Sequence, residues 1–240
     1  MTPLAPKLVL TAHGSADPRS AANTRAVAEK LARMRPALDV QVAFLEQNSP
    51  SLSDVLTRVH GPAVVTPLLL ASAYHARVDI PRQIAGRGRA DVRQADVLGE
   101  DDRLVSVLRE RIAELGVCRL DDTVGVLLVA IGTSNPAVNA RTVRVAPKLL
   151  SGTGWAGATT AFATRPERSL AEGLGRLRRQ GAHRVVIAPW FLAPGLLPDR
   201  VRRFAHGAGI EMAAPLGAHR LVAETVLDRF DQAATERIAA

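Results

Sequence analysis

The sequence predicts an α/β protein made of two tandem domains, each a four-stranded parallel sheet with helices on both faces. Short apolar runs rich in β-branched residues alternate with longer amphipathic stretches, which is typical of the strands and helices of a parallel sheet. The second half of the chain also repeats the first. With 240 residues, 47% of them hydrophobic and 22% charged, the chain can bury one large core or two small ones.

Each predicted strand is followed by a predicted helix. The strands are Lys7–Ala12, Val40–Leu45, Ala63–Leu70, Val92–Leu98, Val124–Ala130, Ala158–Phe162, Arg184–Phe191 and Gly209–Ala213. The clearest helices are Ser20–Arg35, which has apolar residues at helical spacing, and Asp102–Leu115, which is followed by Gly116. The number of these units fits a closed barrel as well as two open sheets.

An internal repeat favours two open sheets. LTAHGSADP at Leu10–Pro18 aligns with LVAIGTSNP at Leu128–Pro136, and the same offset pairs Phe44 with Phe162. Each half is therefore predicted to be one βαβαβαβα module, with domains at 1–117 and 118–240. Parallel strands joined by right-handed crossovers place helices on both faces of such a sheet.

Three candidate metal ligands follow three strands of the first half. His13 comes directly after the first strand, Glu46 directly after the second, and His75 a few residues past the third. The carboxyl ends of parallel strands meet at one edge of a sheet, so we expect these side chains to converge. Two imidazoles and a carboxylate suit a borderline divalent ion, and three protein ligands leave a position open for a substrate.

The second half provides an internal control for this prediction. A lone histidine is commonly a loop residue that is hydrogen-bonded to backbone. The positions that align with the trio hold other residues, namely Ile131, Thr164 and Leu197. Because the repeated scaffold tolerates these residues, the fold does not demand the histidines. We therefore predict one active site per chain.

Other residues near the same edge are candidates for binding an anion. Gly14 and Ser15 open a predicted helix, where free backbone N–H groups bind anions. A second interpretation of GSADP is a turn in which Ser and Asp cap the helix. Several arginines nearby are within reach of ligand carboxylates, although a solvated helix face is the default for each. They are Arg19, Arg25, Arg77 and Arg82.

The composition limits the classes of partner. The chain has 31 Lys and Arg against 23 Asp and Glu, a net charge of +8 that attracts phosphate, nucleic acid or a small polyanion. Nucleic-acid binding is disfavoured because aromatic residues make up only 3% of the chain and the basic residues are scattered. The glycine patterns of dinucleotide and P-loop sites are absent from the sequence.

Cysteine usage and hydropathy predict a soluble, cytoplasmic protein. Cys118 is the only cysteine, so the chain has no internal disulfide and no cysteine-based zinc motif. Residues 1–7 lack the features of a signal peptide, and no apolar run approaches the roughly 20 residues that span a bilayer.

Three motifs resemble those of a known family. AHGS at Ala12–Ser15, FLEQNSPSL at Phe44–Leu52 and PLLLASAYHARVDIP at Pro67–Pro81 are similar to motifs of the class II sirohydrochlorin chelatases, the CbiX and SirB type. The resemblance covers nearly the whole chain, including the doubled architecture of the long members. It implies flavodoxin-like, chelatase-like domains that face across a cleft. It also implies insertion of Fe²⁺ or Co²⁺ into sirohydrochlorin, for sirohaem or cobalamin.

The resemblance also implies roles for individual residues. His13 and His75 would carry the metal and transfer protons, with Glu46 as a third ligand. The divalent metal is then a substrate, and no tightly bound cofactor is expected. Arginine binds carboxylates bidentately, and the backbone N–H groups at the helix start near Ser15 can bind anions. Ser15 and the nearby Arg19 and Arg77 are therefore expected to hold the acidic substrate. One departure puts the placement of His75 in doubt: the family commonly has Gly two residues before this His, where this chain has Ala73.

Several alternatives stay open at this point. The chain could be a chelatase for another tetrapyrrole, or a carrier that binds a tetrapyrrole or a metal without turnover. We favour Fe²⁺ as the inserted metal ion, but imidazole and carboxylate ligands accept Co²⁺ equally. A monomer and a homodimer are both compatible with the tandem arrangement.

Overall fold

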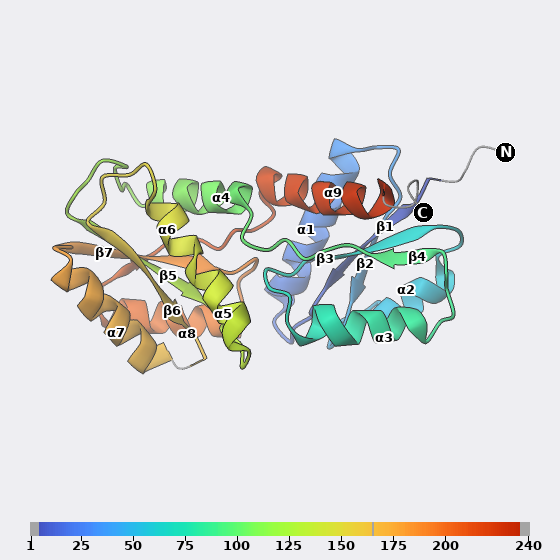
Figure 1. The fold of residues 1–240 in the computed structure, drawn as a ribbon, viewed down its shortest axis with the longest axis horizontal. Helices are drawn as coiled ribbons and strands as arrows, with labels where there is room; N and C mark the ends of the chain where they lie inside the picture. The colour runs from blue at the N-terminus through green and yellow to red at the C-terminus, as the bar shows by residue number, and fades with distance from the viewer. Residues whose placement is uncertain (1–4, 165, 236–240) are drawn as a thin grey trace. The chain divides into compact units, whose positions relative to one another are not determined.

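A computed structural model describes residues 5–164 and 166–235 and contains two all-parallel, four-stranded sheets (Figure 1). Their strand orders are β2-β1-β3-β4 and β6-β5-β7-β8. The strands are β1 (Lys7–Ala12), β2 (Val40–Phe44), β3 (Ala63–Pro67), β4 (Val92–Gln94), β5 (Val124–Ala130), β6 (Gly157–Phe162), β7 (Arg184–Trp190) and β8 (Glu211–Met212). The structure therefore has two open sheets and not the closed barrel that the number of units also allowed. The outer ends of the predicted domains, residues 1–4 and 236–240, lie outside the described residues.

Helices lie on both faces of each sheet, as predicted (Figure 1). One sheet lies between the pair α1 and α9 and the pair α2 and α3, whereas the other lies between α4, α5 and α6 on one face and α7 and α8 on the other. The helical segments are α1 (Pro18–Met34), α2 (Leu52–Arg58), the π-helical turn η1 (His75–Asp79), α3 (Ile80–Ala85), α4 (Asp102–Ala113), α5 (Pro136–Val143), α6 (Val145–Leu150), α7 (Pro166–Arg179), α8 (Leu196–Gly207) and α9 (Arg220–Thr235). None of the described helices is long and apolar enough to cross a membrane.

The central strands are the most apolar segments because both of their faces are covered. Every residue of β5 is buried, and β1 is buried from Leu8 to Ala12. Both strands have the predicted bounds. Strand β3 ends at Pro67, three residues earlier than predicted. The Leu68 N–H donates to the Thr11 carbonyl at 2.8 Å, beyond the last strand residue.

Each compact unit of the fold contains the last helix of the other sequence repeat. One unit comprises residues 1–99 and 218–240, and the other comprises residues 100–217. Helix α4 accordingly packs on β7 and α6, and α9 packs on α1 and β3. The predicted division after residue 117 follows the repeat in the sequence, whereas the units are bounded by the repeated Leu-Gly pairs. Gly99 and Gly217 in these pairs have positive φ angles of 65° and 68°.

Candidate metal centre

The trio of candidate ligands converges at the carboxyl edge of the first sheet. One ligand atom from each of His13, Glu46 and His75 lies within 4.8 Å of the other two. The two imidazole rings lie edge to face, with their centroids 4.2 Å apart. His13 and Glu46 are exposed, and His75 is half-buried. Among the described residues, these three form the only group of three or more His, Cys, Asp or Glu that could hold a metal ion.

Backbone contacts between two loops position His13 beside Glu46. The Glu46 N–H donates to the His13 carbonyl at 2.9 Å, directly after Leu45 pairs with Ala12. Gly14 has a φ of +94°, and a Cβ atom there would lie 1.8 Å from the Glu46 carbonyl oxygen. The position after His13 therefore requires glycine for two reasons: its backbone is left-handed, and the neighbouring loop approaches it too closely for a side chain.

The second half builds the same loop without ligands. The Thr164 N–H donates to the Ile131 carbonyl at 3.2 Å, which matches the bond between Glu46 and His13. Gly132 has a φ of +81°, similar to that of Gly14. The structural equivalence of these loops supports the sequence alignment on which the internal control depends.

The bonds of both imidazoles favour Nε2 as the ligand atom. The His13 Nδ1 lies 3.0 Å from the Gly14 carbonyl oxygen, which can only accept, so Nδ1 carries the proton. The His75 Nδ1 lies 3.1 Å from Asp79 Oδ2. In each ring a protonated Nδ1 leaves the lone pair on Nε2, the form that binds a metal ion.

Asp79 is a residue of this site that the sequence pattern did not identify. It follows His75 by four residues, a spacing at which side chains on a helix contact each other. It also accepts a hydrogen bond from Gln83 at 3.2 Å. Partial burial raises the pKa of Asp79, but the bonds from His75 and Gln83 outweigh burial and hold the pKa below its ordinary value. A charged carboxylate therefore faces the ring nitrogen opposite the candidate ligand atom.

Ala73, which stands where the resemblance leads us to expect glycine, has no backbone strain. Among the described residues, Gln47 is the only one other than glycine with a positive φ, so Ala73 does not occupy the left-handed region. Its carbonyl accepts from the Arg77 N–H at 3.0 Å and so starts the turn that carries His75. The backbone conformation at Ala73 therefore does not require a glycine.

Ser15 is engaged within the protein. Its N–H donates to Asn48 Oδ1 at 2.7 Å, and its hydroxyl accepts from the Asp17 N–H at 3.1 Å. Asp17 is the N-cap of α1 and accepts from the Arg19 N–H at 3.0 Å. These bonds match the interpretation of GSADP as a turn and cap. An anion could bind the Ser15 N–H only after Asn48 releases it.

The candidate arginines differ in their surroundings. Arg19 binds the Asp17 carboxylate through Nε at 3.0 Å, and this bond lowers the pKa of Asp17. The Arg25 guanidinium lies 5.7 Å from the centre of the Phe44 ring. Arg77 and Arg82 are exposed. Arg77 is two residues from His75, and no residue of 5–164 or 166–235 forms a side-chain hydrogen bond or ion pair with its guanidinium. Its guanidinium is therefore available to bind a ligand near the trio.

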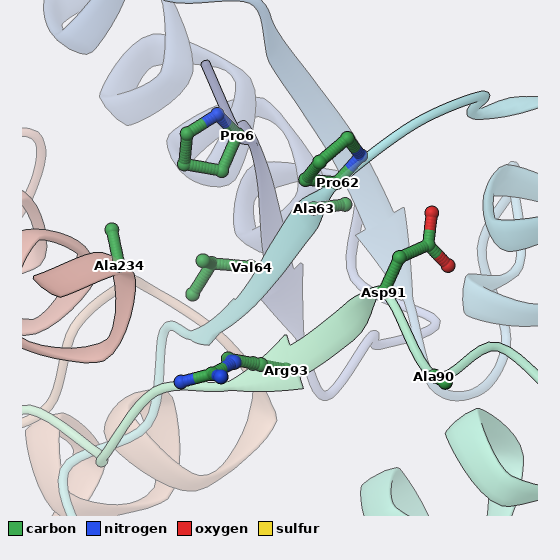
Figure 2. A pocket seen from close by; sticks show the side chains of 8 residues that line it. All are labelled: Pro6, Pro62, Ala63, Val64, Ala90, Asp91, Arg93 and Ala234. Atoms are coloured by element: carbon green, nitrogen blue, oxygen red, sulfur yellow. The ribbon is translucent and has the colours of Figure 1, made fainter. Parts of the chain in front are cut away.

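A pocket of about 280 Å³ lies elsewhere on the same unit (Figure 2). It is lined by Pro6, Pro62, Asp91 and Arg93 among others, residues at the amino ends of β1, β3 and β4. Ligands of open parallel sheets bind at the opposite edge, where the trio lies. We assign this pocket no function.

Comparisons with known proteins agree with the doubled fold. The CbiX family model matches residues 7–115 and again residues 125–233. A sirohydrochlorin ferrochelatase of Priestia megaterium is 32% identical over 186 residues, which cover 71% of this chain and 68% of the relative. A sirohydrochlorin cobaltochelatase of the same organism is 27% identical over 212 residues, covering 81% and 66%. The chain thus spans about two thirds of the length of these curated relatives.

Solved structures share the fold. The structure described as SirB from Bacillus subtilis with Fe³⁺ matches with a TM-score of 0.83 and 20% identity, and the match covers 98% of both chains. SirB from Bacillus subtilis subspecies spizizenii in complex with cobalt matches with a TM-score of 0.78, also at 20% identity.

Proposed function

The chain belongs to the CbiX family, and we propose that it is a sirohydrochlorin chelatase that inserts a divalent metal ion into this tetrapyrrole. The observation that carries the proposal is the convergence of His13, Glu46 and His75 on one exposed edge. Metallation replaces two ring N–H protons with one metal ion. It therefore needs a metal that is incompletely coordinated and a base near the ring.

The trio meets both needs. Three protein ligands leave coordination positions open to the ring nitrogens, so the ion can pass to the macrocycle without first losing every ligand. A histidine that releases the metal has a free nitrogen lone pair, which can accept a ring proton. The metal is a substrate in this scheme, and the protein needs no tightly bound cofactor.

Residues around His75 suit the acidic tetrapyrrole. Tyr74 and Val78 are large hydrophobic residues that are 63% and 45% exposed, and they offer apolar surface to a flat macrocycle. Arg77 lies between them in the sequence and offers a guanidinium to a carboxylate. Arg19 and Ser15 are secondary candidates because both have partners within the protein.

Steady-state metal insertion, followed by the absorbance of the tetrapyrrole, tests the proposal. His13→Ala should abolish insertion and leave sirohydrochlorin binding largely intact. Ile131→Ala is the matched control because Ile131 occupies the equivalent loop of the second half and is 49% exposed. Near-normal turnover by His13→Ala would contradict the assignment, and tight binding without turnover by the unaltered chain would identify a carrier.

The choice of metal and substrate requires a paired assay. Fe²⁺ and Co²⁺ should be compared with sirohydrochlorin and with a porphyrin that has only two carboxylates. We propose Fe²⁺ as the preferred ion and expect poor use of the porphyrin, because it has fewer groups for the cationic side chains. The single, exposed Cys118 suits a reducing compartment, and we propose that the reaction takes place in the cytoplasm.

A further inference from the structure

The turn that carries His75 is wider than an α-helical turn. In η1 the Ile80 N–H donates to the His75 carbonyl, five residues back. This leaves the Ala76 carbonyl without the donor that an α-helix would provide, and the next residue, Pro81, has no N–H to donate. Gln94 of β4 replaces the missing donor, since its Nε2 lies 2.7 Å from the Ala76 carbonyl oxygen. The turn is thereby attached to the sheet.

The wide turn places a carboxylate behind the imidazole. Asp79 is the last residue of η1, and its Oδ2 lies 3.1 Å from His75 Nδ1. Gln83 Nε2 donates to Asp79 Oδ1 at 3.2 Å, so both carboxylate oxygens are engaged. The side chains of His75 and Asp79 are 24% and 23% exposed, which shields their bond from competing water.

The second half lacks this polar set at the matching positions. Leu197 aligns with His75, and Val201 follows it by the same four residues as Asp79. Met212 matches Gln94 in register, because Gln94 pairs with Val65 and Met212 pairs with the equivalent Ile187. Leu197, Val201 and Met212 all belong to or pack against one hydrophobic cluster. The fold can therefore fill these positions with apolar side chains, and the polar set occurs only where the ligands occur.

We propose that Asp79 is a positioning residue of the metal-transfer site, which holds His75 with Nε2 free for the metal, and that Gln94 supports it by fixing the turn. The inference rests on the proposed function in that His75 is taken to carry the metal. Histidine ligands commonly donate their second ring N–H to a carboxylate, and loss of such a partner typically weakens metal affinity or activity about 10- to 100-fold.

Variants that copy the second half test the role of each residue. Asp79→Val removes the carboxylate, Gln94→Met removes the anchor of the turn, and Asp79→Asn keeps an acceptor without the charge. Asp54→Asn is the control, because Asp54 is a helix-capping carboxylate of the same unit that bonds Ser51. Circular dichroism should first establish that each variant is folded.

Three measurements separate positioning from a structural role. Nitrogen-15 NMR of the metal-free chain should show His75 protonated at Nδ1, and Asp79→Val should shift it toward protonation at Nε2. Titration with Co²⁺ alone should show about 10- to 100-fold weaker binding for Asp79→Val, with Asp79→Asn intermediate. In the insertion assay the KM for the metal should rise while the KM for sirohydrochlorin stays unchanged.

The outcomes also separate this inference from the proposed function. Unchanged Co²⁺ affinity and tautomer in both Asp79 variants would overturn the positioning role, whatever the insertion assay shows. A chain that inserts no metal, yet loses Co²⁺ affinity with Asp79→Val, would overturn the chelatase proposal and leave the positioning role intact. If Asp79→Val does not fold, Asp79→Asn and Gln94→Met decide the question by the same measurements.

Discussion

Gly14 allows the loop of His13 to lie directly against the loop of Glu46. Any side chain there would overlap the Glu46 carbonyl oxygen, since a Cβ atom would approach it to 1.8 Å. Gly99 has a comparable left-handed φ, but a Cβ atom there would meet nothing within 4 Å. The two glycines therefore separate the cost of backbone strain from the cost of a steric clash.

We expect Gly14→Ala to abolish Co²⁺ binding because it pushes two ligands apart. Gly99→Ala should cost only the left-handed backbone penalty, about 1–2 kcal/mol, and leave metal binding intact. Calorimetric titration with Co²⁺ and urea unfolding measure the two effects. Normal Co²⁺ affinity in Gly14→Ala would show that the ligands do not depend on this close approach.

Asp17 makes the stability of the first unit sensitive to acid. Its hydrogen bond from Arg19 lowers the pKa of Asp17 in the folded chain, below the ordinary value of about 3.9. A lowered folded pKa contributes stability above the unfolded pKa, and this contribution disappears as the pH falls through the folded pKa. Asp17→Asn should therefore be less stable than the unaltered chain at pH 6, and the difference should shrink below about pH 4. Urea unfolding at a series of pH values measures this difference, and a constant gap would contradict it.

Helix α2 shows how one local motif starts an element. Ser51 and Asp54 form a capping box in which the Ser51 hydroxyl accepts from the Asp54 N–H at 3.1 Å. The helix begins at Leu52, the last residue of the FLEQNSPSL motif. Sequence rules describe this kind of element well, because a capping box involves residues only three apart.

Ser51→Ala should destabilise the chain by about 0.5–2 kcal/mol through loss of the cap. Insertion activity at a temperature well below unfolding should stay close to normal, because within the described residues Ser51 forms no hydrogen bond with any of the three ligands. Thermal unfolding and the absorbance assay provide the two readouts. Loss of activity without loss of stability would mean that the cap also sets the position of Glu46.

The exchange of helices between the repeats has consequences for the whole chain. Helix α9, at the end of the sequence, covers β3 of the unit that holds the trio. Its Phe230 is 4% exposed. Helix α4 follows the first four strands in sequence but covers β7, and its Leu108 is fully buried. Amphipathic helices of similar pattern fit either sheet, so the pattern does not select a partner.

Phe230→Ala should destabilise the first unit by about 3–5 kcal/mol, and Leu108→Ala should destabilise the second by about 2–5 kcal/mol. Hydrogen exchange followed by mass spectrometry should show faster exchange in β3 for Phe230→Ala and in β7 for Leu108→Ala. The reverse pattern would mean that each helix covers the sheet of its own repeat, with a boundary near residue 117.

The sequence by itself determined the two parallel sheets and the edge at which the trio meets. Strands alternate with helices in a local pattern, and the carboxyl ends of parallel strands share one edge of a sheet. The sequence pattern alone therefore predicts that His13, Glu46 and His75 lie at the same edge. Tertiary structure alone decided that Asn48 occupies the Ser15 N–H and that Gln94 anchors the turn of His75. It also decided which sheet α4 and α9 cover. These features depend on hydrogen bonds and packing between residues far apart in the chain, which local periodicity does not encode.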